Sequence, residues 1–158
     1  MNIAVTGANG FIAKNLLLRL KFQKKCKIFK ITRSTSKSQL KLILLKSDII
    51  YHFAGVNRPS KIKTFKKDNV GLTKNICDFI IKYNLNKTIV FSSTIQVNNN
   101  TDYGASKKKC ELYLQKLKKN NKSKVIMLRL PNVYGKWSKP NYNSVVSTFC
   151  YNISRNKK

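Results

Sequence analysis

Residues 2–13 of the chain read NIAVTGANGFIA, and this stretch decides the fold. The short apolar run Asn2–Thr6 predicts a strand, and apolar residues at helical spacing over Phe11–Phe22 predict a helix directly after it. Between them, small residues recur at every third position from Gly7 to Ala13. Glycine lets the backbone turn and approach a pyrophosphate closely, while the helix N-terminus directs free N–H groups at such an anion. The alternative is an ordinary strand-to-helix turn, but this context favours a dinucleotide-binding unit.

The same alternation of strand and helix continues to the end of the chain. Further strands are predicted at Lys27–Thr32, Asp48–Phe53, Thr88–Phe91 and Lys124–Leu130, and further helices at Ser36–Lys46, Lys61–Tyr83, Tyr103–Lys122 and Ser144–Ile153. Such alternation favours a parallel sheet with right-handed crossovers. Because the connection from the second to the third predicted strand is short, we expect one edge strand to be missing. The fold class is therefore α/β, a Rossmann-type doubly wound parallel sheet of about five strands.

Tyr103 and Lys107 are candidates for acid-base chemistry. In a helix, a spacing of four residues places the phenol and the ammonium group on one face, one turn apart. A phenol has a pKa near ~10, and an adjacent positive charge lowers that value, so we expect Lys107 to lower the pKa of Tyr103. Ser92, Ser93 and Thr94 follow the predicted strand Thr88–Phe91, at the sheet edge where open α/β sheets bind ligands.

The residues after the second predicted strand indicate which dinucleotide binds. An acidic residue there would hydrogen-bond the ribose of NAD, whereas an arginine accommodates the phosphate of NADP. The chain has no Asp or Glu before Asp48, and it offers Arg33 and Ser34 with Lys37 nearby. We therefore expect NADP, the alternative being that Arg33 is one more solvated cation.

The net charge is high, since 33 basic and 5 acidic residues give +28. Such a surface attracts any polyanion, so a basic nucleic-acid-binding protein is one alternative. However, the lysines occur in every segment instead of forming one stripe, and no nucleic-acid-binding motif is present. We therefore expect no specific nucleic-acid partner.

The remaining composition is typical of a cytoplasmic globular protein. No apolar run reaches the ~18 residues that span a membrane, so no membrane partner is expected. Four scattered cysteines without a C-x-x-C pair predict free thiols and no zinc site. His52 is the only histidine and is predicted to be a packed or hydrogen-bonded strand residue, so no metal site is expected.

Five motifs resemble the extended short-chain dehydrogenase/reductase superfamily, also called the NAD-dependent epimerase/dehydratase superfamily. They are TGANGFIA at 6–13, HFAG at 52–55, NVGLTKNI at 69–76, SST at 92–94 with YGASK at 103–107, and RLPNVYG at 129–135. Within it, GVNRPS at 55–60, FSSTIQ at 91–96 and the stretch from 130 to 156 are similar to the CapF type of capsular-polysaccharide reductase. That resemblance implies reduction, with NADPH, of a UDP-linked 4-keto-6-deoxy-N-acetylhexosamine on the route to N-acetyl-L-fucosamine.

The resemblance also implies roles for individual residues. Tyr103 would donate a proton to the C4 oxygen, Lys107 would activate Tyr103 and hold the nicotinamide ribose, and Thr94 would hydrogen-bond the carbonyl group. The candidate cofactor-binding residues are Gly7, Asn9, Gly10, Phe11, Ile12, Arg33, Ser34, Ala54, Gly55, Tyr103 and Lys107. The candidate substrate-binding residues are Asn57, Arg58, Asn132 and Lys139, with solvent-exposed charge as the alternative for Arg58 and Lys139.

The length of the chain departs from the CapF pattern. We expect residues 1–158 to form one NAD(P)-binding Rossmann domain without the C-terminal cupin domain and without the later segment that completes the substrate cap. Either a homodimer or pairing with a missing C-terminal half would then be the expected assembly. Two functions remain open: a nucleotide-sugar reductase, active, inactive or split, and a non-catalytic NADP-binding or regulatory protein.

Overall fold

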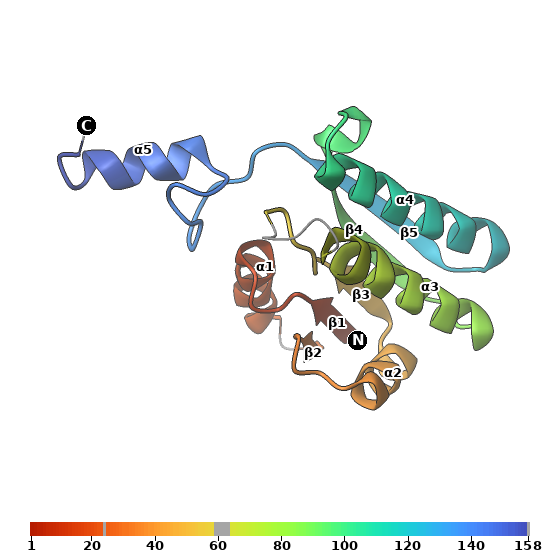
Figure 1. The fold of residues 1–158 in the computed structure, drawn as a ribbon. Coiled ribbons are helices and arrows are strands. Elements are labelled where there is room, and N and C mark those ends of the chain that lie inside the picture. The colour runs from red at the N-terminus through yellow and green to blue at the C-terminus, as the bar shows by residue number, and fades with distance from the viewer. Residues whose placement is uncertain (24, 59–63, 158) are drawn as a thin grey trace.

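A parallel sheet of five strands forms the centre of the computed structural model, which describes residues 1–23, 25–58 and 64–157 (Figure 1). The strands are β1 (Asn2–Thr6), β2 (Lys27–Ile31), β3 (Ile49–His52), β4 (Thr88–Thr94) and β5 (Lys124–Leu130). Their order is β2-β1-β3-β4-β5, and every neighbouring pair is parallel. The chain therefore leaves β1 on one side to form β2 and then returns to form β3 on the other side. Ligands bind at such a switch point in open α/β sheets.

Helices cover both faces of this sheet, which confirms the doubly wound Rossmann-type fold (Figure 1). On one face lies α1 (Phe11–Lys21), and on the other lie α2 (Lys37–Lys46), α3 (Leu72–Lys82) and α4 (Asp102–Asn120). The remaining helical elements are α5 (Val145–Ile153), the π-helix η1 (Phe65–Gly71) and the 3₁₀ helix η2 (Ile95–Asn98). In the described part of the chain β2 is the last strand on its side, as expected for a sheet that lacks one edge strand.

The alternation of side chains along the strands divides the core between the two faces. Ile3 and Val5 of β1 pack with Ala13 of α1 on one face. Ala4 of β1 and Ile50 of β3 point to the other face, where they join the larger cluster formed by α2, α3 and α4. Because successive side chains of a strand point to opposite faces of the sheet, each residue of β1 packs against the helices of only one face.

Two elements differ from the sequence-based prediction. β4 extends to Thr94 instead of ending at Phe91, because its pairing with β5 continues as far as Leu130. The helix predicted over residues 61–83 begins in the described region as the π-helix η1 and becomes regular only at Leu72, while residues 61–63 lie outside the described residues. The wide π-turns occur where the buried side chain of Asn69 binds the backbone of Val56.

Polar caps fix the starts of three helices. Ser36 and Gln39 form a capping box at α2, Ser144 caps α5, and Thr101 caps α4 by accepting a hydrogen bond from the N–H of Gly104 at 3.1 Å. The predicted starts of these helices were each within one residue of the observed starts.

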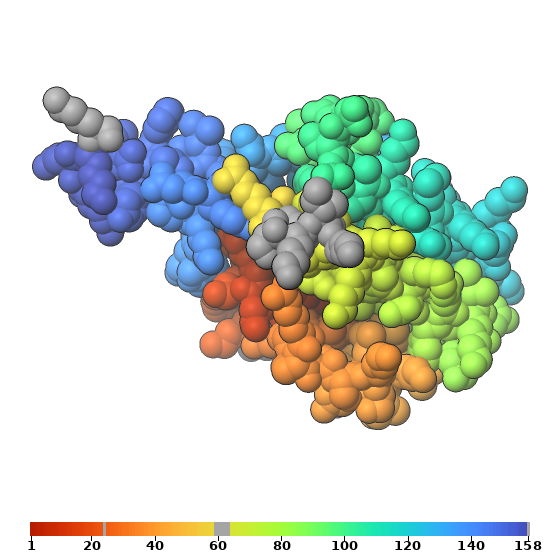
Figure 2. Space-filling model, viewed as in Figure 1, coloured from red at the N-terminus to blue at the C-terminus, as the bar shows by residue number. Residues whose placement is uncertain are grey.

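The last helix, α5, lies beyond the sheet rather than on it (Figure 1). None of its residues is buried, and the side chains of Phe149 and Ile153 are 61% and 75% exposed. The segment between β5 and α5 nevertheless contacts the body of the molecule, since the Asn15 side chain of α1 donates a hydrogen bond to the carbonyl oxygen of Lys136 at 2.9 Å. In the space-filling view this segment lies directly beside the N-terminal part of the chain (Figure 2).

Candidate active site

The turn between β1 and α1 requires glycine. Gly7 has a φ of +65°, a left-handed conformation, and a Cβ at this position would lie 2.7 Å from the Cα of Ala54. The N–H of Gly10 donates to the carbonyl oxygen of Gly7 at 2.7 Å, which closes the turn immediately before α1. Since Gly10 provides no side-chain cap, the first N–H groups of α1 face the space above the sheet. This is the cradle that a phosphate group requires.

His52 supports the floor of this cradle through a buried hydrogen-bond chain. Its Nδ1 lies 2.8 Å from the Thr6 hydroxyl, which also accepts from the Ala54 N–H at 3.0 Å. Its Nε2 lies 2.9 Å from the Thr73 hydroxyl, which donates to the carbonyl oxygen of Asn69 at 2.8 Å. The chain of bonds therefore places the imidazole proton on Nε2. The prediction that His52 is a hydrogen-bonded strand residue is confirmed.

Asn69 joins the loop after β3 to helix α4. Its side-chain oxygen accepts from the N–H of Val56 at 2.8 Å, and its side-chain nitrogen donates to the Val56 carbonyl at 2.9 Å and to the Ser106 hydroxyl at 3.1 Å. A Cβ on Gly55 would lie 3.3 Å from the Nζ of Lys107 and 3.4 Å from this amide oxygen. A larger residue at position 55 would therefore crowd the side chains of Lys107 and Asn69.

Lys107 is buried next to the end of β4. Its Nζ donates to the carbonyl oxygen of Ser92 at 2.6 Å and lies 4.6 Å from the centre of the Phe91 ring. Burial lowers the pKa of Lys107 to about 8, so the ammonium form is only moderately favoured at neutral pH. The side chain is fixed by these contacts in a single position above the strand.

Tyr103 does not have the lowered pKa expected from the sequence. Its half-buried phenol has a raised pKa, mainly because burial disfavours the phenolate. The positive charge of Lys107 does not offset this, since the ammonium group is bound to Ser92 and Phe91 rather than to the phenol. Tyr103 is therefore a protonated acid at neutral pH, which is the state that a proton donor needs.

Two cavities meet at Tyr103, Ser92 and Asn57. The first, about 390 Å³, runs from the glycine turn to α4, and the candidate cofactor residues that line it are Gly7, Asn9, Gly10, Phe11, Ile12, Gly55, Tyr103 and Lys107. The second, about 410 Å³, lies beyond the end of β4 and is lined by Thr94 and by the candidate substrate residues Asn57, Arg58 and Asn132. The structure thus brings these predicted residues to one edge of the sheet.

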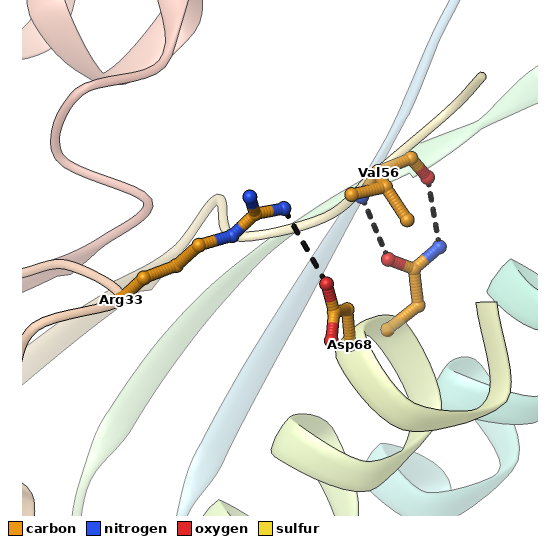
Figure 3. Close-up of polar contacts among 4 residues, drawn as sticks. Arg33, Val56 and Asp68 are labelled. Carbon is orange, nitrogen blue, oxygen red and sulfur yellow. Dashed lines mark hydrogen bonds and ion pairs between the residues drawn. The ribbon is translucent and has the colours of Figure 1, made fainter. Parts of the chain in front are cut away.

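Four predicted residues lie elsewhere. Ala54 packs behind Gly7 instead of lining a cavity, and Lys139 lines the cavity of the glycine turn rather than that of Thr94. Ser34 binds the hydroxyl of Thr32 at 2.8 Å just beyond β2. Arg33 also follows β2 and forms an ion pair with Asp68 of η1, with 3.4 Å between Nη2 and Oδ2 (Figure 3).

Sequence-based reasoning missed two groups of residues near the site. Glu111, one turn after Lys107, is buried and accepts hydrogen bonds from the Ser93 hydroxyl at 2.5 Å and from Arg129 at 2.7 and 3.1 Å. Tyr142 donates to the side-chain oxygen of Asn57 at 2.6 Å, and its ring lies under the guanidinium group of Arg58. A buried acid four residues after Lys107 was a detectable signal, whereas the position of Tyr142 depends on how a loop folds back.

A nicotinamide dinucleotide fits this site because one cavity runs from the glycine turn, where the N-terminus of α1 has no side-chain cap, to Tyr103 and Lys107. The fold and the site thus define a Rossmann-type dinucleotide-binding domain. The model of the NAD dependent epimerase/dehydratase family matches residues 3–158, and the chain belongs to that family. The NAD-dependent family and the fit of the site together support a nicotinamide cofactor.

Individual relatives are similar over almost the whole chain. UDP-2-acetamido-2,6-beta-L-arabino-hexul-4-ose reductase from Pseudomonas aeruginosa is 41% identical over 155 residues, which are 98% of this chain and 42% of that protein. The crystal structure of the capsular polysaccharide assembling protein CapF from Staphylococcus aureus superposes with a TM-score of 0.85 at 42% identity, over 100% of this chain and 43% of that one. The fold is also shared with UDP-glucuronic acid 4-epimerase from Bacillus cereus in complex with NAD, at a TM-score of 0.85 and 18% identity, over 99% of this chain and 65% of that one.

The chain spans about two fifths of the length of the reductase and of CapF. Among the described residues, no helix has both the length and the apolar character needed to cross a membrane.

Proposed function

We propose that this chain is the catalytic nucleotide-binding part of an NADPH-dependent reductase acting on a UDP-linked 4-keto-6-deoxy-N-acetylhexosamine, in the synthesis of a surface polysaccharide containing N-acetyl-L-fucosamine. The observation that carries the proposal is the meeting of two cavities at Tyr103, one leading from the glycine turn and one lined by Thr94. The names of the reductase and of CapF support the substrate and the pathway.

In the proposed reaction, bound NADPH supplies the hydride, and the chain positions the carbonyl group and provides the proton. Tyr103 donates its phenolic proton to the C4 oxygen, a step that suits the raised pKa of this phenol. The Thr94 hydroxyl, at the end of β4, lies in the same cavity and donates a hydrogen bond to that oxygen. The two donors together stabilise the negative charge that develops there.

Lys107 has two tasks in this proposal. After proton transfer, its ammonium group, which is one helical turn away and bound to Ser92 and Phe91 rather than to the phenol, contributes to stabilising the Tyr103 phenolate only through space. Because Lys107 also lines the cavity of the glycine turn, it is placed to bind the ribose next to the nicotinamide. Its hydrogen bond to Ser92 holds it in position for both.

The UDP-sugar is proposed to bind along the cavity of Thr94. Asn57, Arg58 and Asn132 line this cavity, and a guanidinium group is suited to a diphosphate. Lys139 lies along the other cavity, so we assign it no contact with the sugar. The preference for NADPH over NADH rests on Arg33 and Ser34 beyond β2, where no acidic residue precedes Asp48.

Two measurements test the proposal in sequence. NADPH is first titrated against the protein at moderate salt by fluorescence, and its oxidation is then followed by absorbance with a UDP-4-keto sugar present. Tyr103→Phe is expected to keep its affinity for NADPH within about twofold and to lower the rate by about 10²-fold or more. Tyr83→Phe removes an exposed hydroxyl at the end of α3 and is expected to leave both quantities unchanged.

Each outcome separates one function from another. Absence of NADPH binding would reject the nucleotide-binding proposal, and DNA binding that disappears with salt would report only the charge of +28. NADPH binding without oxidation would support a non-catalytic NADP-binding protein. An unchanged rate in Tyr103→Phe would remove Tyr103 as the proton donor.

A further inference from the structure

An acidic residue reaches the cofactor-selecting end of β2 from a distant part of the chain. The backbone there adjoins the glycine turn, since Thr6 pairs with Ile31 and the N–H of Ala8 donates to the Ile31 carbonyl at 3.2 Å. Arg33 follows two residues later. The Oδ2 of Asp68 lies 3.4 Å from its Nη2, although the two residues are 35 positions apart.

Asp68 belongs to a part of the structure that is firmly held. It is the residue before Asn69, whose amide group binds both the N–H and the carbonyl of Val56 (Figure 3). The carboxylate is 32% exposed, whereas the Arg33 side chain is 85% exposed and ends in solvent. The fixed partner of the pair is therefore Asp68, and Arg33 is the one that can move.

We propose that Asp68 limits the preference of this site for a dinucleotide carrying a 2′-phosphate. This inference rests on the proposed binding of NADPH at Arg33. A 2′-phosphate has to draw Arg33 away from Asp68 and also lies near the Asp68 carboxylate, which repels it. NADH carries a 2′-hydroxyl instead, so neither effect opposes its binding, and the carboxylate is an acceptor for that hydroxyl. Asp68 thus reduces, without reversing, the preference for NADPH that Arg33 provides.

The test compares dissociation constants for NADPH and NADH, both measured by fluorescence at low salt. Asp68→Asn is expected to raise the affinity for NADPH relative to NADH by about 1.4-fold to fivefold, the range for an exposed charge pair. Asp68→Ser removes the same charge with a smaller side chain and should give the same result. Circular dichroism verifies that each variant is folded.

Asp78→Asn is the matched control. Asp78 is an exposed acid on α3 that pairs with Lys74, so the substitution changes the net charge equally at a site away from Arg33. The ratio of the two affinities should stay at the wild-type value in this variant. At about 1 M salt, where the Debye length is about 3 Å, the effect of Asp68→Asn should shrink.

A double-mutant cycle separates the two partners. Arg33→Ala should weaken NADPH binding more than NADH binding, and Asp68→Asn should have a smaller effect on the ratio of the two affinities when Arg33 is already alanine. If Asp68→Asn and Asp78→Asn each bind NADPH and NADH with the same ratio of affinities, the role of Asp68 is refuted, while the proposed binding of a dinucleotide stands. If the wild-type protein binds neither dinucleotide, the proposed function fails and this inference fails with it.

Discussion

The buried imidazole of His52 predicts that the stability of the protein depends on pH. Its ring is 1% exposed and bonded at both nitrogens, and burial, followed by the charge of Lys107, lowers its pKa from 6.5 to about 3. Between these two values the unfolded chain binds a proton that the folded protein excludes. Stability from this group is therefore complete above pH 6.5 and decreases as the pH falls below it.

The magnitude follows from the width of that interval. A pH of 5 lies about 1.5 units below the pKa of the histidine in the unfolded chain. Protonation therefore stabilises the unfolded chain by about 1.36 kcal/mol for each of these units. The free energy of unfolding should therefore fall by about 2 kcal/mol between pH 7.5 and pH 5 because of His52 alone. The carboxyl groups change the free energy of unfolding mainly below about pH 5, since the ordinary pKa of a carboxyl group lies near ~4.

Urea unfolding at several pH values measures this change, with His52→Gln as the reference. The variant is expected to be less stable at pH 7.5 but to lose little further stability down to pH 5. Because His52 is the only histidine in the chain, its ring signals in NMR are unambiguous and should not shift over the same range. A ring that titrates near pH 6.5, or parallel stability curves for the two proteins, would refute the reasoning.

Further substitutions test the turn and the buried acid. Gly7→Ala should lower the free energy of unfolding by about 2 kcal/mol or more, because φ is +65° and the new Cβ meets the backbone of Ala54, and it should weaken dinucleotide binding in the same titration. Gly71→Ala, where the new Cβ makes only an ordinary contact at 3.5 Å, should be neutral or stabilising by up to about 1 kcal/mol. Arg129→Ala should lower the midpoint of urea unfolding, because the buried Glu111 then keeps only the bond from Ser93, and an unchanged midpoint would contradict that role.

Local patterns predicted most of the elements correctly. The strand, glycine turn and helix at the N-terminus depend on residues close in sequence, so NIAVTGANGFIA was sufficient to place β1 and α1. The same holds for α4, because the spacing of Tyr103 and Lys107 is a property of one helix. The π-helix η1 was not predicted, since it depends on the contact of Asn69 with Val56 rather than on periodicity.

Contacts between distant segments could not be predicted in this way. The pairing of Arg33 with Asp68 and the bond from Tyr142 to Asn57 join residues 35 and 85 positions apart. The pKa of Tyr103 was predicted in the wrong direction for the same reason. Helical spacing placed a positive charge nearby, but only the fold shows that the charge is bound to Ser92 and that the phenol is half-buried.

The central place of β1 in the sheet has a consequence during synthesis of the protein. β1 pairs with β2 on one side and with β3 on the other, so its second partner is complete only when His52 has emerged. Because synthesis adds about 5–20 residues per second, several seconds pass between the synthesis of the apolar strand Asn2–Thr6 and the completion of its second partner. During that interval it is an open edge available to other nascent chains or to a chaperone, and slow translation would prolong the exposure.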